Sequence, residues 1–304
     1  MRNAEKRILL ASPRGFCVGV ERGVRILADA VNREKGTVYV LGEIVHNTVL
    51  LNRFKSLGAV FAEEIGEIPS GSAVIFPTHG VAPAVREKAL AKNLKIIDAA
   101  CPFVQQVHEE ARRLKKQGYA IVLIGDPDHP EVIGVAGEAP DNIRVVRGEA
   151  DLGRLCGIDG SRVSWLSQTT LDFEATQRTA ELLREKYPSL RDPPRAGVCR
   201  AVSDRQKAVR NIAGECDLFI AVGSANSSNT NRLAEAALEA GAAKAIRADT
   251  PEELDGVDFS AVNTVGVSSG TSVSDAQLAG VISYLKKNGY DRIEERSILD
   301  NCRN

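Results

Sequence analysis

The 304-residue sequence predicts an α/β fold made of three similar units, each with a small parallel sheet. Short apolar runs alternate with helical patterns from end to end, and one set of motifs occurs three times. The expected strands span residues 7–12, 37–42, 73–77, 94–98, 119–125, 163–167, 218–223 and 264–267. The expected helices span residues 18–33, 83–92, 103–117, 173–186, 204–213, 231–240 and 275–287.

Composition excludes several classes of protein. Hydrophobic residues make up 43% of the chain, charged residues 26%, and the formal net charge is −1, so nothing favours binding to nucleic acid or to an anionic membrane. No apolar stretch approaches the length of a membrane span, and the run Ile8–Ala11 is too short for a signal-peptide core. We therefore expect a cytoplasmic monomer without nucleic-acid or membrane partners.

The repeated motif is a cysteine directly before a helix. It occurs as Gly15-Phe16-Cys17, Ala99-Ala100-Cys101 and Gly197-Val198-Cys199. A polar loop follows each cysteine: His46-Asn47, His129-Pro130-Glu131 and Asn226-Ser227-Ser228-Asn229. The spacing from each cysteine to His46, His129 and Ser227 is 28 or 29 residues. A second set of polar loops ends a later strand in each unit: Thr78-His79-Gly80, Gln168-Thr169-Thr170 and Gly270-Thr271-Ser272.

The motif spacing also predicts where the units begin and end. We expect a first unit at residues 1–98 with Cys17, and a second at 99–194 with Cys101. The third, at 195–304, carries Cys199 and a C-terminal tail. A proline-rich linker at residues 187–197 spans the boundary between the second and third units. Ligand groups lie beyond the carboxyl ends of parallel strands, so units that face one axis would bring the three cysteines into one triangle.

Three cysteines at one centre suit a metal site. Zinc is one candidate, but the chain has no Cys-x-x-Cys pair, and three isolated thiolates fit an iron–sulfur cubane better. Such a cluster keeps one iron without a thiolate, which can act as a Lewis acid while the cluster supplies electrons. A non-catalytic zinc- or phosphate-binding module is the alternative of another class. The remaining cysteines, Cys156, Cys216 and Cys302, we interpret as small buried apolar residues.

The loops predict an anion site. His46, His79 and His129 lie in them, and neutral Ser, Asn and Thr side chains at helix starts suit phosphate oxygens. Ordinary N-capping is the alternative for the run 226–229. Glu131 is the carboxylate of a His-Pro-Glu turn and a candidate proton donor, the alternative being a helix-start carboxylate. His108 we expect on a helix surface.

Seven motifs resemble the family of LytB-type 4-hydroxy-3-methylbut-2-enyl diphosphate reductases. They are residues 13–17 (PRGFC), 45–47 (VHN), 78–81 (THGV), 98–102 (DAACP), 129–132 (HPEV), 168–171 (QTTL) and 226–233 (NSSNTNRL). The resemblance runs from about Ile8 to Tyr284, and its motifs are long and ordered. It implies a trefoil of three α/β domains around one iron–sulfur cluster.

The resemblance implies a reaction and roles for residues. The allylic hydroxyl of the substrate, with its oxygen at the open iron of a [4Fe-4S] cluster, would be removed reductively to give isopentenyl and dimethylallyl diphosphate. The cluster would appear as [3Fe-4S] where that iron is lost. A ferredoxin or flavodoxin-type protein would donate electrons. The implied cluster ligands are Cys17, Cys101 and Cys199. The implied catalytic residues are Glu131, Thr169 and His129, and the implied substrate-binding residues are His46, His79, His129, Thr169, Ser227, Ser228, Asn229 and Ser272.

Two positions depart from the family pattern. Arg200 to Gln206 replaces an aromatic residue and a Thr- or Gln-Asn-Arg-Gln run, and Ile133 stands where Glu is usual. Both put local packing or partner contacts in doubt, not the ligand set. The nearest enzymatic alternative is a quinolinate-synthase-like three-cysteine cluster enzyme, which should offer basic residues to carboxylates. The Ser, Asn and Thr side chains in the loops of this chain are neutral, which disfavours this alternative.

Overall fold

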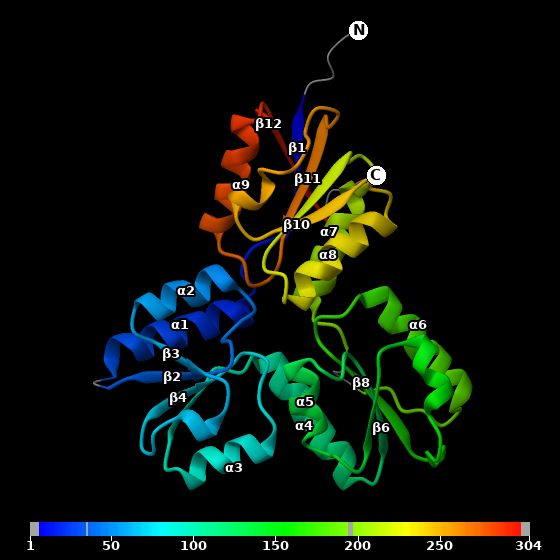
Figure 1. The fold of residues 1–304 in the computed structure, drawn as a ribbon. Coiled ribbons are helices and arrows are strands. Elements are labelled where there is room, and N and C mark those ends of the chain that lie inside the picture. The colour runs from blue at the N-terminus through cyan, green and yellow to red at the C-terminus, as the bar shows by residue number, and fades with distance from the viewer. Residues whose placement is uncertain (1–5, 35, 194–196, 299–304) are drawn as a thin grey trace. The chain divides into compact units, whose positions relative to one another are not determined.

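The computed structural model describes residues 6–34, 36–193 and 197–298, and these contain three sheets in which every strand pairing is parallel (Figure 1). The α/β class with small parallel sheets is therefore confirmed. The chain divides into two compact units. Unit 1 holds the described residues up to Cys17, His46–Val49 and those from Arg200 onward; unit 2 holds Val18–Val45 and Leu50–Cys199.

Sheet A lies in unit 1 and has the strand order β10-β9-β11-β1-β12. Its strands are β1 (Arg7–Ser12), β9 (Leu218–Val222), β10 (Ala245–Ala248), β11 (Thr264–Ser269) and β12 (Arg292–Ser297). Its helices are α7 (Arg200–Ala213), α8 (Ser228–Glu239), α9 (Asp275–Lys287) and the short 3₁₀ helix η3 (Pro251–Leu254).

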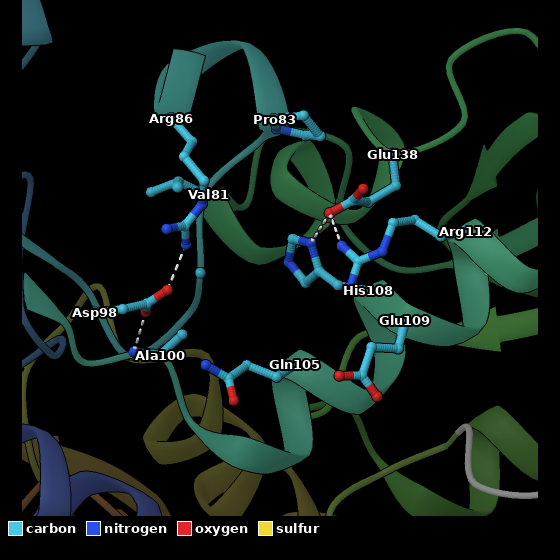
Figure 2. A pocket seen from close by; sticks show the side chains of 11 residues that line it. Val81, Pro83, Arg86, Asp98, Ala100, Gln105, His108, Glu109, Arg112 and Glu138 are labelled. Atoms are coloured by element: carbon cyan, nitrogen blue, oxygen red, sulfur yellow. Dashed lines mark hydrogen bonds and ion pairs between the residues drawn. The ribbon is translucent and has the colours of Figure 1, made fainter. Parts of the chain in front are cut away.

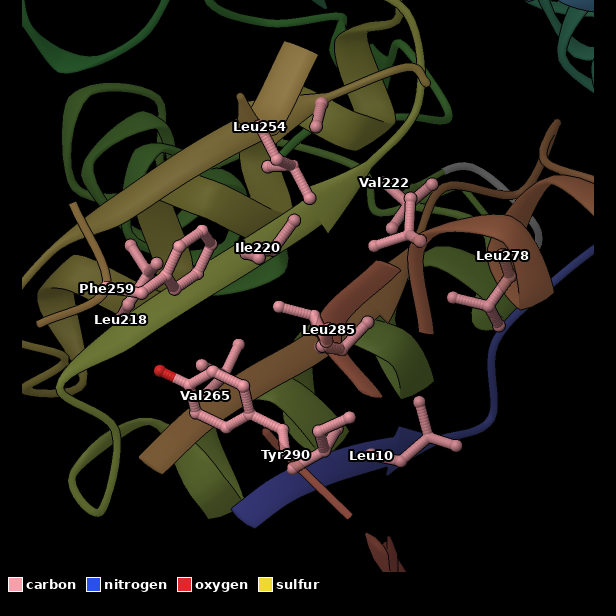
Figure 3. Packing of buried hydrophobic residues seen from close by; sticks show 14 of the residues in the cluster. Leu10, Leu218, Ile220, Val222, Leu254, Phe259, Val265, Leu278, Leu285 and Tyr290 are labelled. Carbon is pink, nitrogen blue, oxygen red and sulfur yellow. The ribbon is translucent and has the colours of Figure 1, made fainter. Parts of the chain in front are cut away.

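Both faces of sheet A are covered, as the continuous apolar character of its central strands requires. On one face, Ile8 and Ile220 pack with Leu278 and Leu285 of α9 (Figure 3). On the other face, the alternate residue Leu9 packs with residues of α7 and α8. Successive strand residues therefore enter different cores, since side chains alternate across a strand.

Sheet B lies in unit 2 and has the order β3-β2-β4-β5. Its strands are β2 (Val38–Leu41), β3 (Val60–Ala62), β4 (Ala73–Phe76) and β5 (Lys95–Asp98). The helices of this stretch are α1 (Val18–Arg33), α2 (Thr48–Ser56), α3 (Pro83–Ala91) and η1 (Ile65–Glu67).

Sheet C, also in unit 2, has the order β7-β6-β8. Its strands are β6 (Ala120–Ile124), β7 (Ile143–Val146) and β8 (Val163–Ser167). The helices of this stretch are α4 (Pro102–Lys116), α5 (Pro130–Ala136), α6 (Phe173–Lys186) and η2 (Glu149–Arg154). In the described part of the chain, no helix is both long enough and apolar enough to cross a membrane.

The three sheets repeat one topology, which confirms the threefold pattern of the sequence. In each sheet, the first strand of a repeat lies between the second and the third strand of that repeat: β3-β2-β4, β7-β6-β8 and β10-β9-β11. A further segment then pairs with the third strand: β5 with β4, β1 with β11, and Arg191 through a single bridge with Ser164 of β8. Each of these segments precedes one of the repeated cysteines in the sequence.

This pairing differs from the expected grouping at one point. The sequence places β1 with the strands of residues 37–98, but β1 hydrogen-bonds to β11 and β12 in sheet A. The reason is that β1 is the last strand of a repeat whose first three strands lie at the other end of the chain. Strand pairing thus joins the N-terminal residues to the C-terminal third.

Glycines at the ends of the central strands let a helix approach the sheet. A Cβ atom on Gly125, after β6, would lie 2.6 Å from Cγ2 of Val132 in α5. A Cβ atom on Gly223, after β9, would lie 2.5 Å from Oγ1 of Thr230 in α8. The two glycines occupy equivalent places, seven residues before their contacts. Glycine there sets how closely each helix N-terminus meets its strand.

We expect the substitution Gly125→Ala to lower the free energy of unfolding by about 1–3 kcal/mol, because the new methyl group overpacks against Val132. Denaturant titration measures the change. Gly153→Ala is the matched control, since its Cβ would meet nothing within 4 Å. Equal stabilities of the two variants would contradict the close approach.

Candidate functional site

The three repeated cysteines are held by the same hydrogen bond. The backbone N–H of each donates to the carbonyl oxygen of a threonine two residues beyond the third strand of a repeat. The pairs are Cys17 with Thr271 (3.1 Å), Cys101 with Thr78 (2.8 Å) and Cys199 with Thr169 (2.9 Å). Each bond lies within one compact unit. Every cysteine is therefore fixed to the carboxyl edge of a parallel sheet.

A helix begins directly after each cysteine: α1 at Val18, α4 at Pro102 and α7 at Arg200. The third helix begins four residues before its expected start at residue 204. All three thiols are free of disulfides and partly exposed. The positive end of a helix favours a thiolate at this position, and thiolates are the ligands of iron–sulfur clusters. The donor chemistry of the three residues therefore fits such a cluster.

The structure separates the other described cysteines. Cys216 is buried, as expected, and burial raises the pKa of its thiol to about 12. The prediction that Cys156 is buried is wrong, because this residue follows η2 in an exposed loop outside the sheets. Cys302 lies outside the described residues.

Within the described part of the chain, no three His, Cys, Asp or Glu side chains form a group that could hold a metal ion. Cys17 belongs to unit 1, and Cys101 and Cys199 belong to unit 2. The meeting of the three thiols at one cluster therefore stays a prediction.

Glu131 and Thr169 of unit 2 are joined by two hydrogen bonds. Oε1 of Glu131 accepts the backbone N–H of Thr169 at 2.7 Å, and Oε2 accepts the Thr169 hydroxyl at 2.9 Å. The two residues are 2% and 5% exposed. Since the carbonyl of the same threonine accepts the N–H of Cys199, one residue links the carboxylate to the cysteine. The expected partnership of Glu131 with Thr169 is thus visible as direct contact.

Two of the loop histidines contact the backbone through Nδ1, but in opposite hydrogen-bonding roles. Nδ1 of His129 accepts the N–H of Glu131 at 3.2 Å and caps α5, so a neutral His129 carries its proton on Nε2. Nδ1 of His79 lies 3.2 Å from the carbonyl oxygen of Gly80 and must donate to it. Nε2 of His129 can therefore donate to an anion, whereas Nε2 of a neutral His79 can accept.

In unit 1, the start of α8 combines a cap with an unpartnered amide. The hydroxyl of Ser227 accepts the N–H of Thr230, so N-capping does explain this serine. It does not explain Asn229. That side chain is 2% exposed, and neither its Nδ2 nor its Oδ1 has a hydrogen-bond partner among the described residues. A buried amide without partners costs about 1–3 kcal/mol, which favours a polar ligand here.

His46 and Ser272 lie together in unit 1, and the hydroxyl of Ser272 donates to the carbonyl of His46 at 3.2 Å. The unit therefore combines residues from two of the predicted loops. Ser228, in the first turn of α8, is partly exposed. The predicted substrate-binding residues of unit 1 are His46, Ser227, Ser228, Asn229 and Ser272, and those of unit 2 are His79, His129 and Thr169.

The expectation that His108 lies on a helix surface is wrong. The residue is 6% exposed, and its Nδ1 lies 2.7 Å from Oε1 of Glu138, which also binds Arg112 at 2.8 Å (Figure 2). Its imidazole packs against Gly80 and Gly134. The side chains of His108, Glu138 and Arg112 line a cavity of about 500 Å³ in unit 2. The sequence pattern missed this because Glu138 is 30 residues away from His108.

Fold and site together define a class: an α/β protein with three repeats, each placing one cysteine between a strand-end threonine and a helix N-terminus. The chain belongs to the LytB protein family, which it matches over residues 8–286.

Curated relatives carry one name. The 4-hydroxy-3-methylbut-2-enyl diphosphate reductase of Mycolicibacterium vanbaalenii is 46% identical over 95% of this chain and 86% of its own length. The reductase of the same name from Rhodococcus opacus is 45% identical over 96% and 87%. These names favour the predicted reductase over the quinolinate-synthase-like alternative.

A solved structure shares the fold. The E-1-hydroxy-2-methyl-but-2-enyl-4-diphosphate reductase from Plasmodium falciparum matches with a TM-score of 0.92 and 31% identity, over 96% of this chain and 92% of that one. The likeness extends over nearly the whole described chain and agrees with the family assignment.

The environment of Glu138 generates a pH prediction. Burial raises its pKa, but the hydrogen bond with His108 and the charge of Arg112 outweigh burial and hold the pKa below the ordinary 4.5. A carboxylate of this kind stabilises the fold above pH 4.5, and the stabilisation is lost as the pH falls through the folded-state pKa. We therefore expect Glu138→Gln to lower stability by roughly 1–3 kcal/mol at pH 7.

The difference between wild type and Glu138→Gln should shrink as the pH falls below 4.5. Denaturant unfolding across that range measures it, with Glu181→Gln, an exposed carboxylate of α6, as control. A difference that stays constant with pH would show that the charge of Glu138 contributes nothing.

Proposed function

We propose that this chain catalyses the reductive dehydroxylation of 4-hydroxy-3-methylbut-2-enyl diphosphate to isopentenyl and dimethylallyl diphosphate. The observation that carries the proposal is a chain of hydrogen bonds from Glu131 through Thr169 to Cys199. A single residue, Thr169, thus connects a buried carboxylate to a candidate cluster ligand. The names of the relatives support it. Removal of the hydroxyl as water consumes two electrons and two protons.

Cys17, Cys101 and Cys199 would hold a [4Fe-4S] cluster. When bound, such a cluster supplies electrons and a Lewis-acidic iron without a protein thiolate. The N–H···O=C bonds would fix the backbone of each cysteine. The helix starts beside the cysteines would stabilise the thiolate form of each ligand. Loss of the fourth iron would leave the three thiolates in use, in a [3Fe-4S] form.

Glu131 would supply the proton for the leaving hydroxyl. As a carboxylate, it accepts two hydrogen bonds from Thr169. Once Oε2 is protonated, the bond to Oγ reverses, and the threonine hydroxyl can donate its own hydrogen onward. Thr169 is thereby both a proton carrier and a substrate contact. His129, whose backbone joins the same turn, would donate from Nε2 to the diphosphate.

The diphosphate would be bound by neutral donors, not by lysine or arginine. His46, Ser227, Ser228, Asn229 and Ser272 of unit 1 and His79 and His129 of unit 2 are the proposed contacts. The unpartnered amide of Asn229 supports this, since a phosphate oxygen would accept from its Nδ2. Helix N-termini add the partial positive charge of their free N–H groups.

The remaining proposals concern setting and partners. We propose a ferredoxin or flavodoxin-type electron donor, a monomeric enzyme and a cytoplasmic location, where single cysteines stay reduced. The division at residues 98/99 and 194/195 is likewise proposed, with β1 contributing to the sheet of the last part.

Replacement of any one of Cys17, Cys101 and Cys199 by serine should abolish cluster assembly. Anaerobically purified wild type should contain about four irons and four sulfides per chain, with visible thiolate-to-iron absorption. Each variant should fall well below these counts, and Cys156→Ser, an exposed cysteine, is the control that should not. A colourless wild type, or full iron in Cys101→Ser, would overturn the ligand assignment.

Glu131→Gln should lower kcat by roughly 10²–10⁴ while iron content and diphosphate binding remain. The amide keeps the shape of the carboxyl and can still accept the Thr169 N–H, but it cannot deliver a proton. Oxidation of methyl viologen by the substrate measures turnover. Glu109→Gln, on the exposed side of α4, is the control. Turnover near that of wild type would exclude the proton role.

A further inference from the structure

The His46-Asn47-Thr48 turn of unit 1 is tied down through the side chain of Asn47. This residue is 1% exposed, and its Nδ2 donates to the carbonyl oxygen of Ser272 at 2.6 Å and to Oε1 of Gln277 at 2.9 Å. Ser272 in turn donates to the carbonyl of His46. Two proposed diphosphate contacts are therefore joined by an amide that touches both loops.

A second attachment holds the other end of the turn. The backbone N–H of Thr48 donates to the hydroxyl of Ser224, the second residue after β9, at 2.9 Å. The Ser224 hydroxyl donates its own hydrogen to Oδ2 of Asp249 at 2.5 Å. Gln277 reaches the same residue, since its Nε2 donates to Oδ1 of Asp249 at 2.6 Å and to the carbonyl oxygen of Asp249 at 2.8 Å.

Both attachments thus end at one buried carboxylate. Asp249 follows β10 and is 6% exposed. Within the described residues, its carboxylate is bonded to a hydroxyl and an amide, and no lysine, arginine or histidine pairs with it. A buried carboxylate without a cation is costly for the fold. Its presence is better explained by what it does to its neighbours than by stability.

The carboxylate sets the direction of every bond in this network. Because it can only accept, it turns the Nε2 of Gln277 toward itself and leaves Oε1 facing Asn47. Asn47 must then present Nδ2, the donor, to Gln277 and to Ser272. The Ser224 hydrogen is likewise committed, which leaves its oxygen to accept from Thr48.

We infer that Asp249 and Gln277 are positioning residues that hold the His46-Asn47-Thr48 turn against Ser272 in the geometry that binds diphosphate. Both residues act on the proposed substrate contacts through Asn47 and Ser224. The inference rests on the proposed function for its ligand, while the positioning itself concerns only the protein. Loss of the network loosens the turn and lowers diphosphate affinity, with little effect on the chemical step.

The test exchanges the donor and the acceptor of the hydrogen bond between the side chains of Gln277 and Asp249. Gln277→Glu places two carboxylates together and breaks the network from one side. Adding Asp249→Asn returns a donor to the side-chain pair: the new amide NH₂ faces the new carboxylate, which still accepts from Asn47, and the amide oxygen accepts from Ser224. The bond from residue 277 to the main-chain carbonyl of residue 249 is lost in both variants. The matched control is Gln177→Glu, a half-buried glutamine of α6 in unit 2.

Three measurements on the full chain, purified anaerobically, apply to each variant. Hydrogen exchange of the peptide that contains Thr48 reports the turn. Calorimetric titration with inorganic diphosphate reports affinity, and steady-state kinetics separate KM from kcat. We expect Gln277→Glu to speed exchange, weaken diphosphate binding about 10–100-fold and raise KM similarly, with kcat within about threefold. The double variant should recover part of each change, a non-additivity that marks direct coupling.

Unchanged exchange in Gln277→Glu would overturn the positioning role. Faster exchange with unaltered diphosphate affinity would overturn the link between the turn and the ligand. Additive losses in the double variant would show general destabilisation instead of an oriented network. A wild type that neither binds diphosphate nor turns over the substrate would refute the proposed function, and the exchange data would still decide the positioning role separately.

Discussion

One hydrogen bond, made three times, organises this protein: the backbone N–H of a cysteine donating to the carbonyl of a threonine just past a strand. It joins Cys17 to Thr271, Cys101 to Thr78 and Cys199 to Thr169. The bond ties the start of a helix to the carboxyl edge of a sheet. The strands of that sheet come from the preceding repeat for Cys101 and Cys199, and from the last repeat of the chain for Cys17. Each cysteine is therefore placed by its backbone at the edge of a parallel sheet where ligand groups generally lie.

The same threonine position also carries chemistry in one repeat. Thr169 gives its carbonyl to Cys199, and its N–H and hydroxyl to Glu131. A single residue thus orients a candidate cluster ligand and a candidate acid, with no flexible side chain between them. Such rigidity suits a reaction in which a proton must reach a defined oxygen. It also explains why the carboxylate can remain buried, because each of its oxygens accepts a hydrogen bond from Thr169.

Polar groups that reduce stability are concentrated where a ligand is expected. Among the residues that the structure describes, no group hydrogen-bonds the buried amide of Asn229, and no cation pairs with the buried carboxylate of Asp249. Elsewhere the central strands β1, β9 and β11 of sheet A contribute apolar side chains to cores on both faces. This contrast separates the part of unit 1 that maintains the fold from the part that prepares a binding surface. Local cost at a site of this kind is a common consequence of preorganisation.

The sequence by itself determined the repeated unit. Apolar runs, helix starts and the recurrence of Cys17, Cys101 and Cys199 are local signals, so strands, helices and equivalent loops could be predicted from them. Only the tertiary structure decided that β1 joins β11, that His108 is buried against Glu138, and that Asp249 meets Gln277. These pairs are about 28 residues or more apart in the chain. No local pattern marks them, because their pairing follows from how sheets and helices pack.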